Sequence, residues 1–235
     1  MFGWSDMDFA VLPATLLIII LISLALYAIL KNKSDRIKEI PLIVITCILL
    51  VLEVIKQVRE FRSGYDYWAI PLHFCSLFLY FYPLAVFAKG KIKDFGKTMS
   101  LVCSSLMFIM FYINPDSIIG RGTTTNFLTS YGLFHTFIYH HLVILFLVLS
   151  IMLNFYKFKK ENFIHVLIGF SLYAIISVPM AYVLNTNFCN ILEGNVPIIE
   201  SFRLFVGQIW YTIALYTFSI VAGTVIVALQ GKIEK

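Results

Sequence analysis

The stretch Glu53-Val54-Ile55-Lys56-Gln57-Val58-Arg59-Glu60 ends an apolar segment that begins at Pro41 and is long enough to cross a membrane. A charged residue near the centre of a bilayer span costs about 2.5 kcal/mol or more, so such residues normally face a bundle interior or a wet cavity. At 100° per residue, Glu53, Lys56, Gln57 and Glu60 share one helix face, and Arg59 lies off it. The stripe is therefore one wall of a polar cavity, or else a structural ion pair beside basic side chains that reach the interface.

Seven apolar segments are long enough, or nearly so, to cross about 30 Å of hydrocarbon. They are residues 9–30, 41–60, 68–88, 98–113, 133–154, 163–184 and 205–229. The 235-residue chain is 60% apolar and 13% charged, a composition unlike that of a water-soluble domain. The apolar runs also lack the period-two alternation of barrel strands. The sequence thus predicts an all-α, polytopic membrane protein with a single seven-helix domain over residues 1–235.

Basic residues are concentrated in alternate connections between the predicted spans. The connections after the first, third, fifth and seventh spans hold 13 of the 18 Lys and Arg residues. The positive-inside rule then predicts an external N-terminus and a cytoplasmic C-terminus in a cell membrane. These anchoring residues account for the net charge of +5, so we expect no nucleic acid as a partner.

The third predicted span opens with Pro71-Leu72-His73-Phe74-Cys75-Ser76. In a regular helix, His73, Ser76 and Tyr80 share a face at i, i+3 and i+7, whereas Cys75 points elsewhere. An imidazole beside a hydroxyl is the arrangement of a base and a nucleophile. His73 and Ser76 are therefore candidate catalytic residues, with Cys75 joining them only if the helix unwinds at this end. The alternative for His73 is an interhelical hydrogen bond.

The fifth predicted span carries three histidines. Tyr131, His135 and Tyr139 repeat at i+4 and share one face, and His140 lies on a neighbouring face. His141 is rotated by a further 100°, so the three histidines cannot all face one cavity. We expect His135 or His140 to line a functional site, the alternative again being hydrogen bonds between helices.

Polar residues gather in the outer half of the predicted spans, which predicts one outward-facing cavity. Besides the candidate catalytic residues, its expected ligand-binding residues are Glu53, Lys56, Gln57, Tyr80, Tyr139, Asn185 and Arg203. We predict that Glu53 is buried and partnered by His73 or by a residue of the fifth span. No Cys/His zinc spacing occurs, and we expect no cofactor. A metal held by Glu53, His73 and His135 stays open, because ligands from separate helices leave no sequence spacing.

Three short motifs carry a resemblance to a known family. They are Glu53 in the second span, Pro71-Leu72-His73-x-Cys75-Ser76 opening the third, and Phe134-His135-x-x-x-Tyr139-His140 in the fifth. With them the chain resembles, over nearly its whole length, the YwaF-like bacterial integral membrane proteins. That group is similar to a vertebrate multi-span acyltransferase that remodels ether phospholipids through a cysteine acyl-enzyme and a histidine. It is more remotely similar to multi-span lipid hydrolases with a threonine nucleophile and a histidine.

The resemblance implies a location in a bacterial plasma membrane, membrane lipid as the partner, and a lipid acyl or ester substrate that is reached from the bilayer. It also implies a catalytic histidine in the fifth span, either His135 or His140. The vertebrate motif is Pro-Cys-His, and its cysteine position is occupied here by Leu72. The nucleophile therefore does not carry over, although His73 matches the motif.

Two functions are consistent with these residues. The first is a lipid acyltransferase or lipid-ester hydrolase, in which a histidine acts as general base and Ser76, Cys75 or water as nucleophile. Lys56 would then bind a lipid phosphate as a point charge. The second is a carrier or receptor for a small polar ligand, although the paired broken helices of repeat-built carriers are missing from the sequence.

The predicted orientation has a direct test. A cysteine introduced between Lys89 and Lys97 should resist membrane-impermeant thiol reagents in intact cells, because this segment is predicted to be cytoplasmic. A cysteine introduced in the predicted external segment 62–68 serves as the reactive control, with both compared against the unmodified chain. Labelling of the first position without permeabilisation would overturn the orientation.

Overall fold

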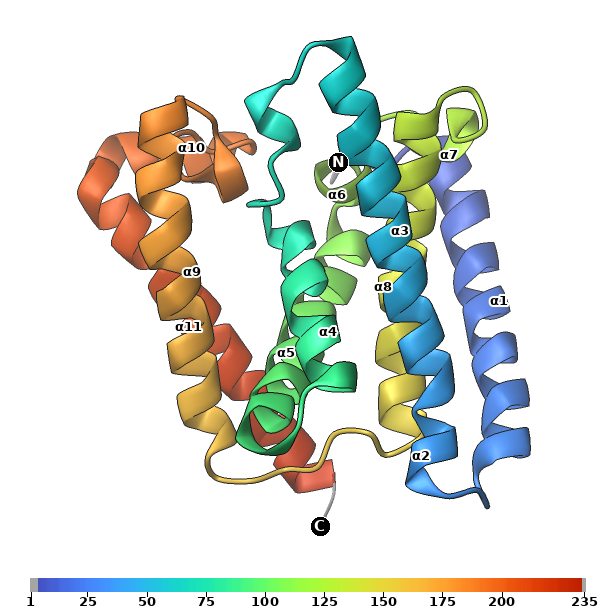
Figure 1. The fold of residues 1–235 in the computed structure, drawn as a ribbon. Helices are drawn as coiled ribbons and strands as arrows, with labels where there is room; N and C mark the ends of the chain where they lie inside the picture. The colour runs from blue at the N-terminus through green and yellow to red at the C-terminus, as the bar shows by residue number, and fades with distance from the viewer. Residues whose placement is uncertain (1–3, 234–235) are drawn as a thin grey trace. The chain divides into compact units, whose positions relative to one another are not determined.

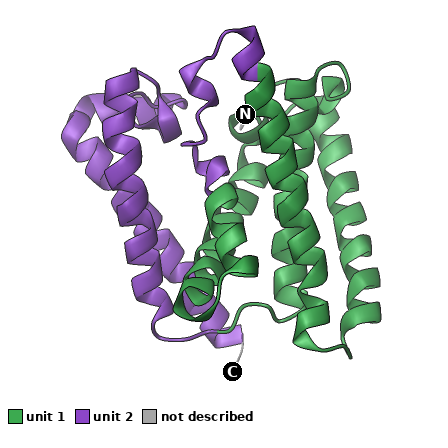
Figure 2. Ribbon diagram, viewed as in Figure 1, with its two compact units in different colours: residues 1–59, 78–157 green, residues 60–77, 158–235 purple. Residues whose placement is uncertain are grey.

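The computed structural model describes residues 4–233, and within this range every regular element is an α-helix or a short 3-10 helix. Figure 1 shows the course of the chain. Two compact units can be distinguished, the first formed by residues 1–59 and 78–157 and the second by residues 60–77 and 158–235 (Figure 2). Each unit combines segments that are far apart in the sequence.

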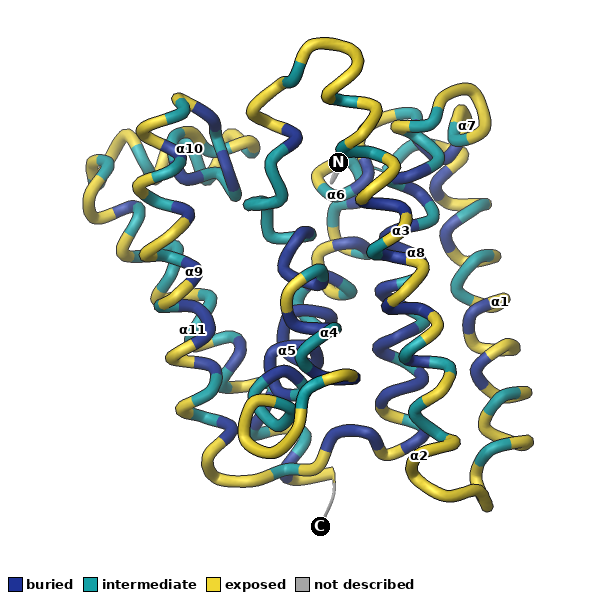
Figure 3. Tube along the Cα trace, in the orientation of Figure 1, coloured by how far each residue is buried: buried dark blue, intermediate teal, exposed yellow. Residues whose placement is uncertain are grey.

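The first unit contains eight helices in its described part. They are α1 (Asp6–Leu30), α2 (Asp35–Lys38), α3 (Ile40–Ser63, whose last turn belongs to the second unit), α4 (Phe78–Phe87), α5 (Gly90–Ile113), α6 (Pro115–Ile119), α7 (Thr123–Asn126) and α8 (Tyr131–Met152). Helix α8 is the most deeply buried of the long apolar helices, because 61% of its most apolar 18-residue stretch is buried. The corresponding share for α1 is only 17%. Figure 3 shows α1 as largely exposed.

Polar contacts attach the exposed helix α1 to the rest of its unit. Asp8 is buried and accepts a hydrogen bond of 2.7 Å from Thr124 Oγ1 in α7. Two turns further along, Thr15 Oγ1 lies 2.9 Å from Nε2 of His141 in α8. In an apolar solvent such pairs hold helices together where the hydrophobic effect contributes little.

The closest helix packing in the first unit joins α4 to α5. A Cβ added at Gly96 would lie only 2.5 Å from the backbone nitrogen of Ala85, so no larger residue fits at this crossing. One turn before Ala85, Tyr82 is fully buried, with its ring stacked on Phe146 of α8 and its hydroxyl 2.7 Å from Ser104 Oγ.

The second unit is built on two long helices. Its elements are η1 (Tyr67–Ala69), η2 (Phe74–Leu77), α9 (Asn162–Leu184), η3 (Phe188–Asn190), α10 (Pro197–Val206) and α11 (Gln208–Ile233). A buried cluster of Ala181, Phe188 and Ile191 packs the end of α9 against the loop that follows it, and Ile70 and Leu72 join this cluster. The segment around His73 is therefore held within this unit by apolar contacts.

The prediction of a continuous third span over residues 68–88 is wrong. The chain forms η1, then a non-helical stretch, then η2, and only Phe78–Phe87 is α-helical. Pro71 is the physical reason, since a proline disfavours the helical conformation of the residue before it, and Ile70 has an extended ψ of 131°. His73 and Ser76 therefore do not share the face of an α-helix.

Three further boundaries differ from the prediction. The segment between Lys89 and Lys97 is the start of α5 and not a loop, and Lys93 and Lys97 pair there with Glu39 at 2.7 and 3.7 Å. The polar connection 114–131 contains the short helices α6 and α7. The last predicted span, 205–229, begins only at Gln208, because Gly207 takes a φ of +82° and separates α10 from α11.

Five of the described helices are long and apolar enough to cross a membrane, which makes the chain an all-α, multi-pass membrane protein. These helices are α1, α5, α8, α9 and α11. The apolar segment Phe74–Phe87 is shorter. The number of seven spans and the orientation of the termini stay predictions.

The α4–α5 crossing gives a prediction with a matched control. Gly96→Ala should lower thermal stability in detergent, by about 1–3 kcal/mol, because the new methyl group meets backbone atoms that cannot move aside. Gly132→Ala in α8 makes the same change where no atom lies within 4 Å, and it should be neutral or slightly stabilising. Equal melting temperatures for the two variants would show that this crossing is loosely packed.

Candidate functional site

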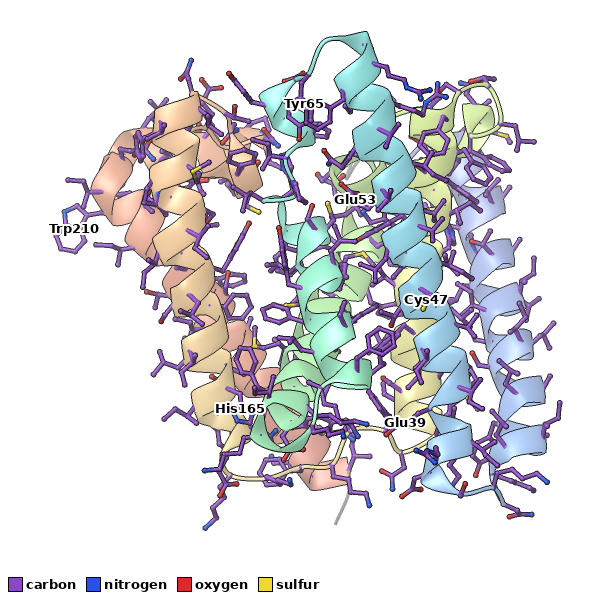
Figure 4. The ribbon with its side chains drawn as sticks, viewed as in Figure 1. Glu39, Cys47, Glu53, Tyr65, His165 and Trp210 are labelled. Atoms are coloured by element: carbon purple, nitrogen blue, oxygen red, sulfur yellow. The ribbon has the colours of Figure 1, made fainter. Side chains whose placement is uncertain are left out.

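The Glu53 carboxylate is the centre of a polar cluster in the first unit. Glu53 is 8% exposed, and its Oε1 accepts hydrogen bonds of 2.6 Å from Gln57 Nε2 and 3.2 Å from Lys56 Nζ. The expected stripe on α3 is thus confirmed for these three residues, which meet because i+3 and i+4 neighbours share a helix face. Figure 4 labels Glu53 on its helix.

His135 of α8 completes this Glu53 cluster from another helix. Its Nε2 lies 3.6 Å from Glu53 Oε2, and both side chains are about 10% exposed. The prediction that Glu53 is buried and partnered by a residue of the fifth span is confirmed. At 3.6 Å the contact is within ion-pair distance but is longer than a hydrogen bond.

Aromatic rings and a backbone contact position the His135 imidazole. The ring stacks on Tyr139 at 5.3 Å and lies 5.9 Å from the Tyr131 ring, as the i+4 spacing predicted. The Tyr131 hydroxyl donates a hydrogen bond of 2.7 Å to the carbonyl oxygen of Leu52, the residue before Glu53. The Arg59 guanidinium lies 5.1 Å from the centre of the Tyr131 ring. Helices α3 and α8 are thereby joined beside the Glu53–His135 pair.

His140 and His141 have different surroundings, as their rotation on the helix predicted. Nδ1 of His140 lies 2.7 Å from the Thr136 carbonyl oxygen, which can only accept, so this nitrogen carries the proton. Nε2 of His140 is then an acceptor, and it is buried without a hydrogen-bond partner among the described residues. His141 instead contacts Thr15 of α1 and so belongs to the packing of that helix.

Several buried polar side-chain atoms of the first unit have no hydrogen-bond partner among the described residues. Within the described residues they include His135 Nε2, His140 Nε2, Tyr112 Oη and Asn114 Oδ1. Buried polar atoms in proteins normally have a partner, so atoms of this kind are candidates for contact with water or a ligand. Tyr112 and Asn114, at the end of α5, were missed in the sequence, where their position at the end of a span was the only available signal.

Tyr80 has a less central position in the first unit than expected. It lies on α4, is 45% exposed, and interacts electrostatically with the Glu53 carboxylate. It is therefore a residue near the Glu53 cluster and not part of its buried core.

His73, Cys75 and Ser76 belong to the second unit. His73 Nε2 lies 3.0 Å from the Trp68 carbonyl oxygen, which corresponds to the alternative of a structural hydrogen bond, although the partner is local. The ring also packs against Trp68 and Phe188. Ser76 is buried and donates its backbone N–H to the His73 carbonyl oxygen, while Cys75 is half-buried in η2.

Asn185 and Arg203 are also in the second unit, and both have local structural contacts. Asn185 is exposed and ends α9 with a φ of +47°, a conformation that asparagine tolerates. Arg203 pairs with Glu200 in the same helix and with Gln208 at 3.0 Å. The Arg203 guanidinium and the backbone N–H of Gly194 lower the pKa of Glu200 to about 2, so this pair is ionised at neutral pH.

The predicted site residues therefore fall into two groups. The first unit holds Glu53, Lys56, Gln57, Tyr80, His135, Tyr139 and His140, and the second holds His73, Cys75, Ser76, Asn185 and Arg203. A single cavity shared by both groups stays a prediction. No set of three or more His, Cys, Asp or Glu side chains in residues 4–233 is arranged to hold a metal ion.

Comparison with known proteins gives a family but no characterised relative. No curated protein and no solved structure matches the chain. The family model described as the TMEM164 family matches residues 1–229, which is nearly the whole sequence and includes every residue of the Glu53 cluster. The chain therefore belongs to the TMEM164 family of membrane proteins.

Proposed function

We propose that the protein is a membrane-embedded lipid acyltransferase or lipid-ester hydrolase whose general base is His135. The observation that carries the proposal is the buried Glu53 carboxylate, 3.6 Å from His135 Nε2 and on a different helix. Burying a carboxylate in an apolar span is costly, and an imidazole that gains charge during a reaction is a partner that justifies it.

The chemistry requires a proton to move twice. His135 would take the proton of an attacking hydroxyl, thiol or water as that group adds to the acyl carbonyl carbon of a lipid ester. The resulting imidazolium would be stabilised by the Glu53 carboxylate, and His135 would then return the proton to the departing alcohol oxygen. Gln57 holds Glu53 in place through its 2.6 Å hydrogen bond.

The nucleophile is Ser76, Cys75 or water. Ser76 and Cys75 lie together in η2, and either would form an acyl-enzyme if it meets the base. A water molecule would need no covalent step and would lead to hydrolysis. The unpartnered Nε2 of His140 is a second acceptor that would suit a lipid hydroxyl or this water.

Lys56 has a more restricted role than a free phosphate-binding cation. Its Nζ lies 3.2 and 3.5 Å from the two Glu53 oxygens, so it already neutralises the carboxylate. Any lipid phosphate that it binds must share it with Glu53. Binding of the head group would then weaken the hold of Lys56 on Glu53 and leave more of the carboxylate charge for His135.

A second function is favoured by the unpartnered atoms themselves. The buried Nε2 atom of His140 would also suit a carrier or receptor that binds a small polar ligand without transforming it. Saturable binding or uptake of such a ligand, with no acyl product, would support this alternative.

The Glu53–His135 pair makes a prediction about activity. In lipid nanodiscs, acyl transfer or release measured by mass spectrometry should fall roughly 10²-fold or more in His135→Ala, because a general base contributes about that much. Glu53→Gln keeps the shape but removes the charge, and should also lose most of the activity. Arg59→Gln also removes a charge from α3, but at an exposed residue off the stripe that contacts this site through the Tyr131 ring, so it should lower activity much less. Equal effects of Glu53→Gln and Arg59→Gln would contradict the proposal.

The nucleophile can be identified by covalent labelling. We expect a lipid-like fluorophosphonate probe to label the wild type but not Ser76→Ala or His135→Ala, since the hydroxyl and its base are both needed. Labelling that disappears only in Cys75→Ala would assign the cysteine instead. Activity without labelling of any variant would favour attack by water.

A further inference from the structure

Helix α10 (Pro197–Val206) has its charged residues on the side that faces its own unit. At 100° per residue, Ile199, Glu200, Arg203 and Val206 form one side of the helix, and all four are partly buried. Leu204, Ser201, Phe205, Ile198 and Phe202 form the opposite side, and all five are exposed. The largest apolar side chains are thus on the exposed side, whereas a helix on a water-soluble protein buries its apolar face.

Several hydrogen bonds hold the polar residues on the inward side of α10 in place. Glu200 Oε2 accepts hydrogen bonds from the Gly194 backbone N–H at 2.7 Å and from Arg203 Nε at 2.9 Å. Arg203 also donates to Gln208 Oε1, and Gln208 Nε2 donates to the Ile191 carbonyl oxygen at 2.6 Å. These bonds fix the rotation of α10 about its axis and so hold the apolar side outward.

The outward side consists of four large apolar side chains and Ser201. Ile198 is 77% exposed and Phe205 is 88% exposed, and Leu204 and Phe202 flank these two on the outward side. No Lys or Arg belongs to this surface, and Arg203 is bound to Glu200 on the other side. A patch of this kind, in a protein surrounded by water, would be a site of association or aggregation.

The same surface continues into a membrane span. Only Gly207 separates α10 from α11, and the first residues of α11 include Ile209 and Trp210, which are 75% and 67% exposed. Figure 4 shows Trp210 projecting away from its ribbon. Helix α11 is apolar enough to cross a membrane, and only 11% of its most apolar 18-residue stretch is buried. An exposed tryptophan at the start of such a helix is typical of the membrane interface, where tryptophan is enriched.

We infer that α10 is an in-plane membrane helix whose surface of Ile198, Phe202, Leu204 and Phe205 lies against the acyl chains of the lipids around α11. The occupant is hydrocarbon and not an anionic head group, because the surface offers no cation to a phosphate. Amphipathic helices of this kind lie in the interface with the apolar face buried about 5–10 Å. The inference does not depend on the proposed enzymatic activity.

Photocrosslinking tests this placement in the full-length protein with its cysteines intact. Phe205 is replaced by p-benzoylphenylalanine, which inserts into C–H bonds within reach, and the protein is reconstituted in phosphatidylcholine nanodiscs and illuminated. Ile198 is replaced in a second variant, and the exposed loop residue Glu193 in a control. We expect lipid adducts by mass spectrometry at least 10-fold more abundant for residues 198 and 205 than for residue 193.

The outcomes separate the alternatives. Equal lipid adducts at all three positions, or none at residues 198 and 205, would overturn the inference. Crosslinks to a second copy of the chain would assign the surface to self-association and would also overturn it. Exchanging part of the phosphatidylcholine for phosphatidylglycerol should leave the adduct yield within about two-fold, whereas a strong increase would indicate head-group binding and contradict the choice of acyl chains.

Discussion

The cost of placing charge and hydrogen-bonding groups in hydrocarbon is the constraint on which this structure depends. Glu53 meets it with Gln57 and Lys56 on its own helix and with His135 on another, so one carboxylate connects α3 to α8. Asp8 meets it through Thr124, and His141 through Thr15, and these two contacts attach the exposed helix α1. In each case a polar residue that would be unfavourable in lipid specifies which helices are in contact. Hydrophobic burial alone would not favour one contact over another, because lipid is as apolar as the helix surfaces.

The same constraint explains α10, where the usual arrangement of a surface helix is reversed. Glu200 and Arg203 are tied to Gly194 and Gln208 on the protein side, and the apolar residues are left outside. In water this arrangement would be unfavourable, because it exposes apolar side chains to solvent. Beside the start of a membrane helix, the polar side of α10 bonds to the protein and its apolar side can contact lipid. The polar cluster of the first unit and the apolar surface of the second unit thus both follow from the apolar character of the lipid bilayer.

Residues on a single regular helix were predicted well, because their relation depends only on backbone geometry. Glu53, Lys56 and Gln57 meet as the 100° rotation requires, and so do the rings of Tyr131, His135 and Tyr139. The prediction for the third span was wrong for a local reason. Pro71 favours an extended conformation at Ile70, and His73 lies just before the 3-10 helix that starts at Phe74. The sequence had allowed His73 or a residue of the fifth span as the partner of Glu53, and only the fold selects His135.

The sequence by itself determined the solvent and the class of fold: its composition and its long apolar runs require a multi-pass helical protein, and its in-span charges mark the place where function is to be sought. The tertiary structure decided which helices meet, that Lys56 is occupied by Glu53, that His140 keeps a buried acceptor, and that α10 turns its charges inward. The physical reason is that a helix in lipid is apolar toward its neighbours and toward the bilayer alike. Hydrophobic periodicity then says little about which side of a helix faces the other helices and which side faces lipid. The contacts between helices depend on residues that are distant in the chain.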